Sequence, residues 1–148
     1  MRKKTDFNLK LLALNDDDLK VLSAHLQDSV VLAKDIIFLK KSRTFLMMVN
    51  RFMWEDIELG IFRENKRIRC AVKFENVLEV KSRNVSQKKK DKILELLSID
   101  SEVKNNKKEL LITFAGNNEI ILIVEEINIL LDDVGLSWKV KHVPKHQL

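Results

Sequence analysis

The stretch "VVLAKDIIFLKKSRTFLMMVNRFMW", residues 30–54, holds two apolar runs separated by the dipeptide Ser42-Arg43. A two-residue connection between such runs is the spacing of a β-hairpin, so residues 30–41 and 44–54 are predicted to be antiparallel neighbours. The second run is apolar on both of its faces, as in a strand that is covered from both sides. We therefore expect it in the centre of a sheet.

The sequence that follows predicts five further strands. The first two alternate apolar and charged residues and are separated by a turn at Glu75-Asn76; the last three are separated by polar turns. Residues 93–103 would also suit a helix, but the hairpin partner that follows them favours a strand. The predicted strands are residues 66–74, 77–85, 93–103, 109–116 and 119–124.

A short strand and a helix precede the hairpin. Residues 8–14, "NLKLLAL", predict the strand, and residues 15–29, "NDDDLKVLSAHLQDS", predict the helix. Asn15 can accept a hydrogen bond from the first turn, and the three aspartates that follow it suit the positive end of the helix dipole. The buried face of this helix is defined by apolar residues at helical spacing: Leu19, Leu22, Leu26 and Val30.

A second helix is predicted at residues 125–135, "EEINILLDDVG". It begins with two glutamates, and four apolar residues recur on one face. Gly135 would follow its last turn, where Leu136 can contact Leu131 as in a Schellman motif. The apolar residues are Ile127, Leu130, Leu131 and Val134.

The order of these elements predicts an α+β fold with a mainly antiparallel, strongly bent sheet or partly open barrel. Four strands, a charged loop, three strands and a terminal helix resemble the pleckstrin-homology-like superfold. In that arrangement the C-terminal helix would cover the open end of the sheet, and the N-terminal strand and helix would be additions. A flatter two-layer α+β sandwich fits the same elements.

The length and composition are those of one globular domain. The 148 residues are 45% hydrophobic and 33% charged. We expect residues 8–140 to form the domain, between a disordered N-terminus (residues 1–7) and a frayed tail (residues 141–148). The single Cys70 excludes a disulfide framework, and no segment has the pattern of a signal peptide or membrane span. These features predict a cytoplasmic protein.

Four segments of the sequence resemble a family of short bacterial proteins of unassigned function, found mostly in alphaproteobacteria. The resemblance covers about residues 9–140, and it implies no catalytic residues or cofactor. The segments are "ALNDDDLKVLSAHLQDSVV" (13–31), "VNRFMWE" (49–55), "VKFENVLEVKSRNV" (72–85) and "FAGNNEIILIVEEI" (114–127).

Catalytic chemistry has little support in the sequence. Ser23, His25 and Asp28 are types that a hydrolase uses, but side chains two apart on a helix diverge, so they cannot form a triad alone. Cys70 falls on the inward side of its strand, where a thiol behaves as a small apolar group. His142 and His146 have helical spacing, but Pro144 between them argues against a helix and a metal site. We expect no enzyme activity, no metal and no cofactor.

Two binding surfaces are candidates. The first is a cationic strand face that would attract nucleic acid or another polyanion, although it lacks interleaved aromatic residues and a solvated face is the commoner meaning of this pattern. It comprises Arg67, Arg69, Lys73, Lys81 and Arg83, with Lys88, Lys89 and Lys90 nearby. The second is an apolar contact surface for a protein partner or another copy of the chain. It comprises Trp54, Ile57, Leu59, Ile61 and Phe62.

The uneven charge bears on this choice. The net charge is +5, and residues 1–92 carry 21 Lys/Arg against 13 Asp/Glu. Such an excess can mark a surface for an acidic partner or nucleic acid, but the abundance of Lys, Ile and Asn is also typical of an AT-rich genome. We favour the compositional explanation. The sequence therefore predicts a non-enzymatic module that acts by protein–protein contact, with polyanion binding as the alternative.

Overall fold

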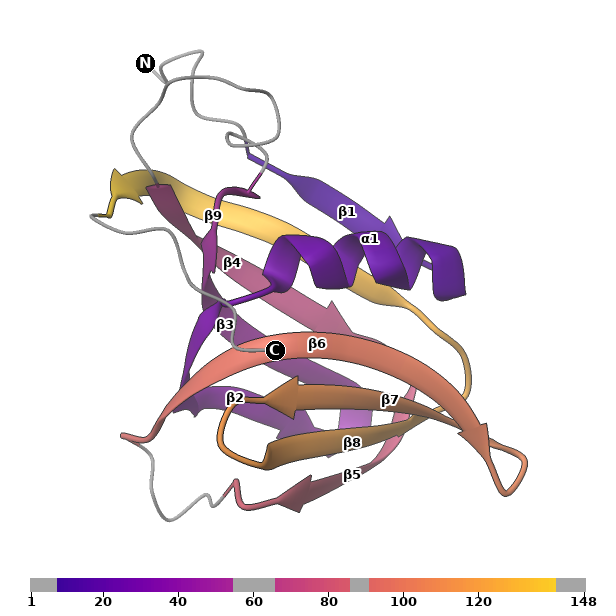
Figure 1. Ribbon diagram of the computed structural model, residues 1–148. Coiled ribbons are helices and arrows are strands. Elements are labelled where there is room, and N and C mark those ends of the chain that lie inside the picture. Colours follow the sequence, from indigo (N-terminus) through magenta and orange to yellow (C-terminus); the bar gives the residue numbers. More distant parts are fainter. Residues whose placement is uncertain (1–7, 55–65, 86–90, 141–148) are drawn as a thin grey trace.

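The computed structural model describes residues 8–54, 66–85 and 91–140 (Figure 1). The predicted disordered N-terminus, the loop of residues 55–65 and the frayed tail lie outside the described residues. Within them the elements in chain order are β1 (Lys10–Ala13), α1 (Asp16–Leu26), β2 (Val30–Leu39), the short 3-10 helix η1 (Lys40–Ser42), β3 (Thr44–Phe52), β4 (Lys66–Phe74), β5 (Val77–Arg83), β6 (Ile93–Lys104), β7 (Lys107–Phe114), β8 (Asn118–Val124) and β9 (Ile129–Lys139).

The hairpin predicted at residues 30–54 is confirmed, but its connection is the four residues 40–43 and not the dipeptide Ser42-Arg43. β2 and β3 pair antiparallel, and Leu39 lies opposite Thr44 at the closed end. Arg43 in the connection has a φ of 53°, a left-handed conformation that reverses the chain within a few residues. β3 is an interior strand of the sheet, between β2 and β4. The run that is apolar on both faces is therefore flanked by a strand on each edge, as expected.

The nine described strands form one open antiparallel sheet in the order β1-β9-β4-β3-β2-β6-β7-β8-β5. The sheet bends between β2 and β6, so that two layers face each other. We call β1, β9, β4, β3 and β2 the first layer, and β6, β7, β8 and β5 the second layer. The edges β1 and β5 do not pair, so the sheet is not closed into a barrel.

The predicted N-terminal helix is confirmed as α1. The side chain of Asn15 accepts a hydrogen bond from the Asp18 amide at 2.8 Å, and the Asp18 carboxylate accepts one from the Leu14 amide at 3.0 Å. These reciprocal bonds satisfy two free amides at the start of the helix. Leu19 and Leu22 are buried in the core. In Figure 1, α1 lies between β1 and β6, so it covers one open side of the bent sheet.

The hydrophobic core fills the space between the two layers. It combines the inward side chains of both layers with the buried face of α1. Phe45 and Phe74 meet edge to face, with ring centroids 5.7 Å apart. Among the described residues, no helix is long and apolar enough to cross a membrane.

The predicted C-terminal helix is wrong, because residues 129–139 form strand β9. β9 pairs with β4 on one side and with β1 on the other. Ile129, Leu131 and Asp133 are buried at a spacing of two, which is the period of a strand. Gly135, with a φ of 80°, lies in an irregularity of β9 rather than after a helix.

The expected pairing of residues 66–74 with 77–85 is also wrong. The chain does turn at Glu75-Asn76, but β4 stays in the first layer while β5 pairs only with β8 at the edge of the second layer. A short connection can join two layers as well as two neighbouring strands. The pleckstrin-homology-like arrangement therefore fails in its terminal helix and in its fourth strand. The coarser expectation of a bent, mainly antiparallel sheet with an N-terminal helix is confirmed.

Candidate binding site between two sheet edges

β2 is paired on both sides along only part of its length. Val30, Val31 and Leu32 lie opposite residues of β6, and the Ala33 amide donates a hydrogen bond to the Lys92 carbonyl at 2.9 Å. Beyond this point β2 turns away from β6 and pairs with β3 alone. Within the described part of the chain, residues 34–39 therefore present unpaired backbone groups along one edge.

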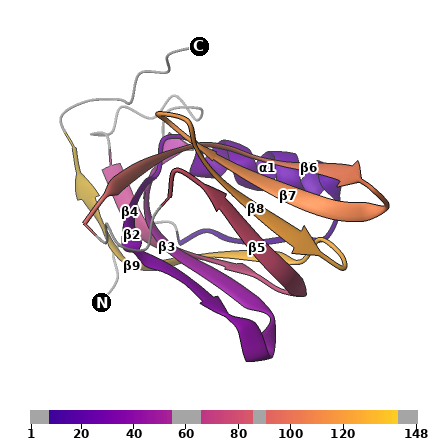
Figure 2. The same cartoon turned by 90° about the horizontal axis from the view of Figure 1, so that it is seen from below.

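A cavity of about 240 Å³ lies beside this free edge. Figure 2 shows β5 between β8 and the β2–β3 hairpin, on the side of the molecule that faces the viewer. The cavity is bounded by β2 and β3 on one side and by β5 and β8 on the other. All its lining residues except Ser82 have apolar side chains: Ala33, Ile36, Phe38, Phe45, Val80, Ser82, Val85 and Ile120.

The two edges that face the cavity differ in chemistry. The free half of β2 ends in four consecutive apolar residues, 36–39, of which Ile37 and Leu39 are about half exposed. The edge strand β5 carries the outward charges Glu79, Lys81 and Arg83. Charged residues protect an edge strand from pairing with another chain, whereas an exposed apolar edge invites it. The free half of β2 is therefore the edge that is open to an added strand.

The structure separates the five residues of the predicted cationic face, because β4 and β5 belong to different layers. Arg67 is turned toward the protein: its guanidinium donates to the carbonyls of Asp28 at 3.1 Å and Asn50 at 3.0 Å, and it lies 5.9 Å from the centre of the Phe52 ring. Burial lowers the pKa of Arg67, and the negative charges of Asp28 and Glu95 oppose that shift. Arg67 therefore ties the end of α1 to β3.

Three of the other four cations have acidic partners. Arg69 lies 3.5 Å from Asp35, Lys73 lies 2.9 Å from Glu75, and Arg83 lies 4.0 Å from Glu119. The hydrogen bond from Lys73 is the main cause that lowers the pKa of Glu75, and a bond from Thr44 adds to it. Lys81 is exposed on β5. The predicted Lys88, Lys89 and Lys90 lie outside the described residues.

Of the predicted apolar contact surface, only Trp54 is described. Its indole Nε1 donates to the Gln27 carbonyl at 2.9 Å, and its ring meets Phe52 edge to face at 4.6 Å. Trp54 thus packs beside the end of α1. The other four predicted residues, Ile57, Leu59, Ile61 and Phe62, lie outside the described residues.

The residues that were considered for catalysis are held within the fold by packing and hydrogen bonds. The Ser23 hydroxyl accepts a hydrogen bond from the Ile99 amide at 2.9 Å, which ties α1 to β6. The Nδ1 atom of His25 is buried and has no hydrogen-bond partner among the described residues. Cys70 is fully buried on β4, as predicted, and burial together with the negative charge of Asp133 raises the pKa of its thiol.

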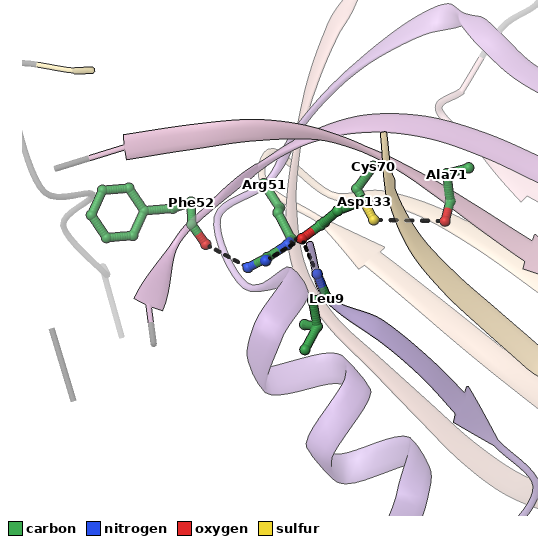
Figure 3. Close-up of polar contacts among 6 residues, drawn as sticks. All are labelled: Leu9, Arg51, Phe52, Cys70, Ala71 and Asp133. Carbon is green, nitrogen blue, oxygen red and sulfur yellow. Dashed lines mark hydrogen bonds and ion pairs between the residues drawn. The ribbon is translucent and has the colours of Figure 1, made fainter. Parts of the chain in front are cut away.

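A buried ion pair joins Arg51 to Asp133 next to Cys70 (Figure 3). The guanidinium donates from Nε to Oδ1 at 2.7 Å and from Nη2 to Oδ2 at 2.6 Å, and both side chains are fully buried. The Leu9 amide donates to the same carboxylate at 2.8 Å, and the Leu9 carbonyl accepts from the Asp133 amide at 2.9 Å. This pair is sealed from solvent, so we assign it to stability rather than to binding.

The chain matches the family model described as "Protein of unknown function (DUF2948)" over residues 9–146. The chain belongs to the DUF2948 family. This finding confirms the resemblance to an uncharacterised family. Searches of curated proteins and of solved structures gave no match to this DUF2948 chain.

Sequence reasoning missed the cavity of the DUF2948 chain. The run Ile36–Leu39 lies in a strand that was predicted correctly, but the sequence pattern did not show that half of this strand lacks a second neighbour. Val80 comes from β5, which was predicted correctly along the chain but pairs with β8 instead of β4, whereas Ile120 comes from β8, which pairs with β7 as expected.

Proposed function

We propose that this protein is a protein-contact module that binds an extended segment of a partner along the free half of β2. The observation that carries the proposal is the unpaired edge at residues 34–39, apolar from Ile36 to Leu39, directly beside an apolar cavity. Strand addition supplies affinity through backbone hydrogen bonds, and pockets for alternate side chains supply specificity. The single cysteine favours a meeting of the two proteins in the cytoplasm.

The cavity volume supports a peptide more than a small molecule. Pockets for small ligands have volumes of roughly 300–1,000 Å³, whereas this cavity measures about 240 Å³. A cavity of about 150 Å³ holds benzene, so the space fits one or two large apolar side chains. In an added strand these would be residues i and i+2, because alternate side chains point to the same face.

The elements that bound the cavity carry four exposed lysines against the acidic Asp35 and Glu79, which favours a partner with acidic residues beside its apolar pair. Lys34 lies on the free half of β2, Lys40 and Lys41 follow it in η1, and Lys81 lies on β5. All four are exposed. Opposite charges on the partner would increase the rate of association and fix the direction of the added segment.

The test uses the synthetic peptide Ac-EETFTITEE-NH2, in which Phe and Ile are two residues apart. The matched control, Ac-EETFITTEE-NH2, has the same composition but points them to opposite faces. We expect the first peptide to bind with a Kd of about 10–100 μM and the control at least about tenfold more weakly. Amide chemical shifts should move at Ile36, Phe38 and Val80. Equal binding of the two peptides would refute the proposal.

Two substitutions locate the binding. Phe38→Asp places a charge in the cavity lining, and Ala33→Phe fills the cavity without removing a core side chain. Each should weaken binding of the first peptide at least about tenfold. Val103→Asp is the control, because Val103 is an exposed residue near the β6–β7 turn and far from this lining. Unchanged binding by a folded Ala33→Phe variant would place the peptide elsewhere.

Polyanion binding is our second proposal, and it is carried by the overall charge of +5. It receives less support because Arg67, Arg69 and Arg83 have partners within the protein. Retention on heparin that is lost with modest salt would favour it. If the protein passes through the heparin column without binding at about 0.15 M salt, the protein partner is favoured.

A further inference from the structure

The outer face of the first layer carries an apolar row that no described element covers. Pairing places Ile37 opposite Leu46, Leu46 opposite Lys73, Lys73 opposite Leu130 and Leu130 opposite Leu12. Residues that face each other across antiparallel strands point to the same side of a sheet. The row therefore crosses all five strands and contains four large apolar side chains.

This row lies on the opposite side of the sheet from the core. The neighbouring residues Phe45, Phe74 and Ile129 point inward and are buried, and α1 packs on that inner side. On the outer side Ile37 is 48% exposed and Leu12 is 54% exposed. Two apolar pairs, Ile37 with Leu46 and Leu130 with Leu12, thus flank Lys73 on this face, and exposed apolar patches of this kind mark contact surfaces.

We propose that the outer face of the first layer binds a second copy of the chain, as a two-fold symmetric dimer. The first argument is charge. Three opposite-sign pairs lie on or beside this face: Lys10 opposite Asp132, Lys73 with Glu75, and Arg69 with Asp35. Arg67, on the same side of β4, donates to two backbone carbonyls instead. The chain has a net charge of +5, but this face is nearly balanced, so it suits its own copy better than a polyanion.

The second argument is area. The strands β1, β9, β4, β3 and β2 lie about 4.8 Å apart and have 4, 11, 9, 9 and 10 residues, at about 3.3 Å per residue, so together they cover on the order of 700 Å². A standard interface buries roughly 600–1,000 Å² on each partner. The face is thus large enough for two copies to pack as stacked sheets, which lie about 10 Å apart in proteins.

The third argument is symmetry. β4 is the middle strand of the first layer, with β3 and β9 as its two neighbours. A two-fold axis parallel to β4 and midway between the two facing sheets places β3 of one copy over β9 of the other. Leu46 of each copy then packs on Leu130 of the other copy. Lys73 lies on β4 between them, and its Nζ forms an ion pair with Glu75 of the same chain at 2.9 Å. An interface of this kind uses the same patch on both copies.

Sedimentation equilibrium of the full chain over about 5–200 μM tests the proposal, with an expected dimer Kd on the order of 10 μM. Leu46→Lys should weaken the dimer at least about tenfold, whereas Ile93→Lys, at an exposed residue of the second layer, should not. A chain that stays monomeric throughout would overturn the proposal, and so would a dimer that Leu46→Lys leaves intact.

Position-specific crosslinking gives a second measurement that does not depend on a destabilising substitution. In a Cys70→Ala background, Lys73→Cys places a thiol near the proposed axis and Lys81→Cys places one on the edge strand β5. A short bis-maleimide should link two copies of the first variant and not of the second. The reverse result, or equal crosslinking, would exclude this face. The peptide site at β2 is independent, since its cavity is lined by inward residues.

Discussion

Arg51 and Asp133 form a bidentate ion pair that spans β4 and joins β3 to β9, and both side chains are buried from solvent. Removing one member of a buried pair leaves an uncompensated charge, which costs roughly 3–5 kcal/mol. We therefore expect Asp133→Ala to lower the free energy of unfolding by about that amount in urea titrations. The variant would also lose the hydrogen bond to Leu9 that holds the start of β1.

The double substitution Arg51→Met with Asp133→Leu separates the charge from the packing. Apolar replacement of a whole buried pair is often neutral or stabilising, so the double variant should recover most of the loss, to within about 1–2 kcal/mol of the original protein. If the losses of unfolding free energy in the single variants Arg51→Met and Asp133→Leu add up to the loss in the double variant, the ion pair itself contributes little.

The helix start offers a smaller effect. Asn15 accepts a hydrogen bond from the Asp18 amide, and replacing such a cap by alanine costs about 1 kcal/mol. Asn15→Ala should therefore lower the unfolding midpoint, while Asn15→Asp, which keeps the acceptor, should leave it nearly unchanged. If both variants lose the same stability, the cap is not the cause.

Most strands were predictable from the sequence because their burial has a period of two that is visible locally. β9 was not, because Asp133 interrupts the apolar alternation in the sequence while its partner Arg51 lies 82 positions away. Read without that partner, the sequence shows Leu130 and Val134 as part of a helical apolar pattern. In the structure Leu130 is half-buried and Val134 is exposed. A buried ion pair between distant residues is thus the physical reason for the error.

The position of the candidate site could not be predicted from the sequence either, because it also depends on contacts between distant parts of the chain. Local patterns located β2 and β5, but only the whole topology decides that β5 pairs with β8 and that half of β2 has no second neighbour. Period-two patterns define which face of a strand is buried and say nothing of its edges.

Amide hydrogen exchange should detect the free edge directly. Along residues 34–39 alternate amides point away from β3 and lack a backbone acceptor among the described residues, so we expect them to exchange much faster than the amides of β3, which pairs on both sides. The Ala33 amide serves as an internal control, since it donates to the Lys92 carbonyl at 2.9 Å at the end of the short ladder with β6. Uniform protection along β2 would show that its edge is covered.

The buried thiol of Cys70 should make the free energy of unfolding depend on pH. Burial and the charge of Asp133 raise the pKa of the thiol in the folded protein, so the folded state keeps its proton at pH values where the unfolded chain, with a thiol pKa near 8.5, loses it. The stability contributed by this group is present below about pH 8.5 and falls as the pH rises, by about 2 kcal/mol between pH 7 and pH 10. Cys70→Ala pays a constant cavity cost but lacks this slope, so the difference between the two proteins in urea titrations should shrink with rising pH. A difference that is independent of pH would mean that the thiol titrates alike in both states.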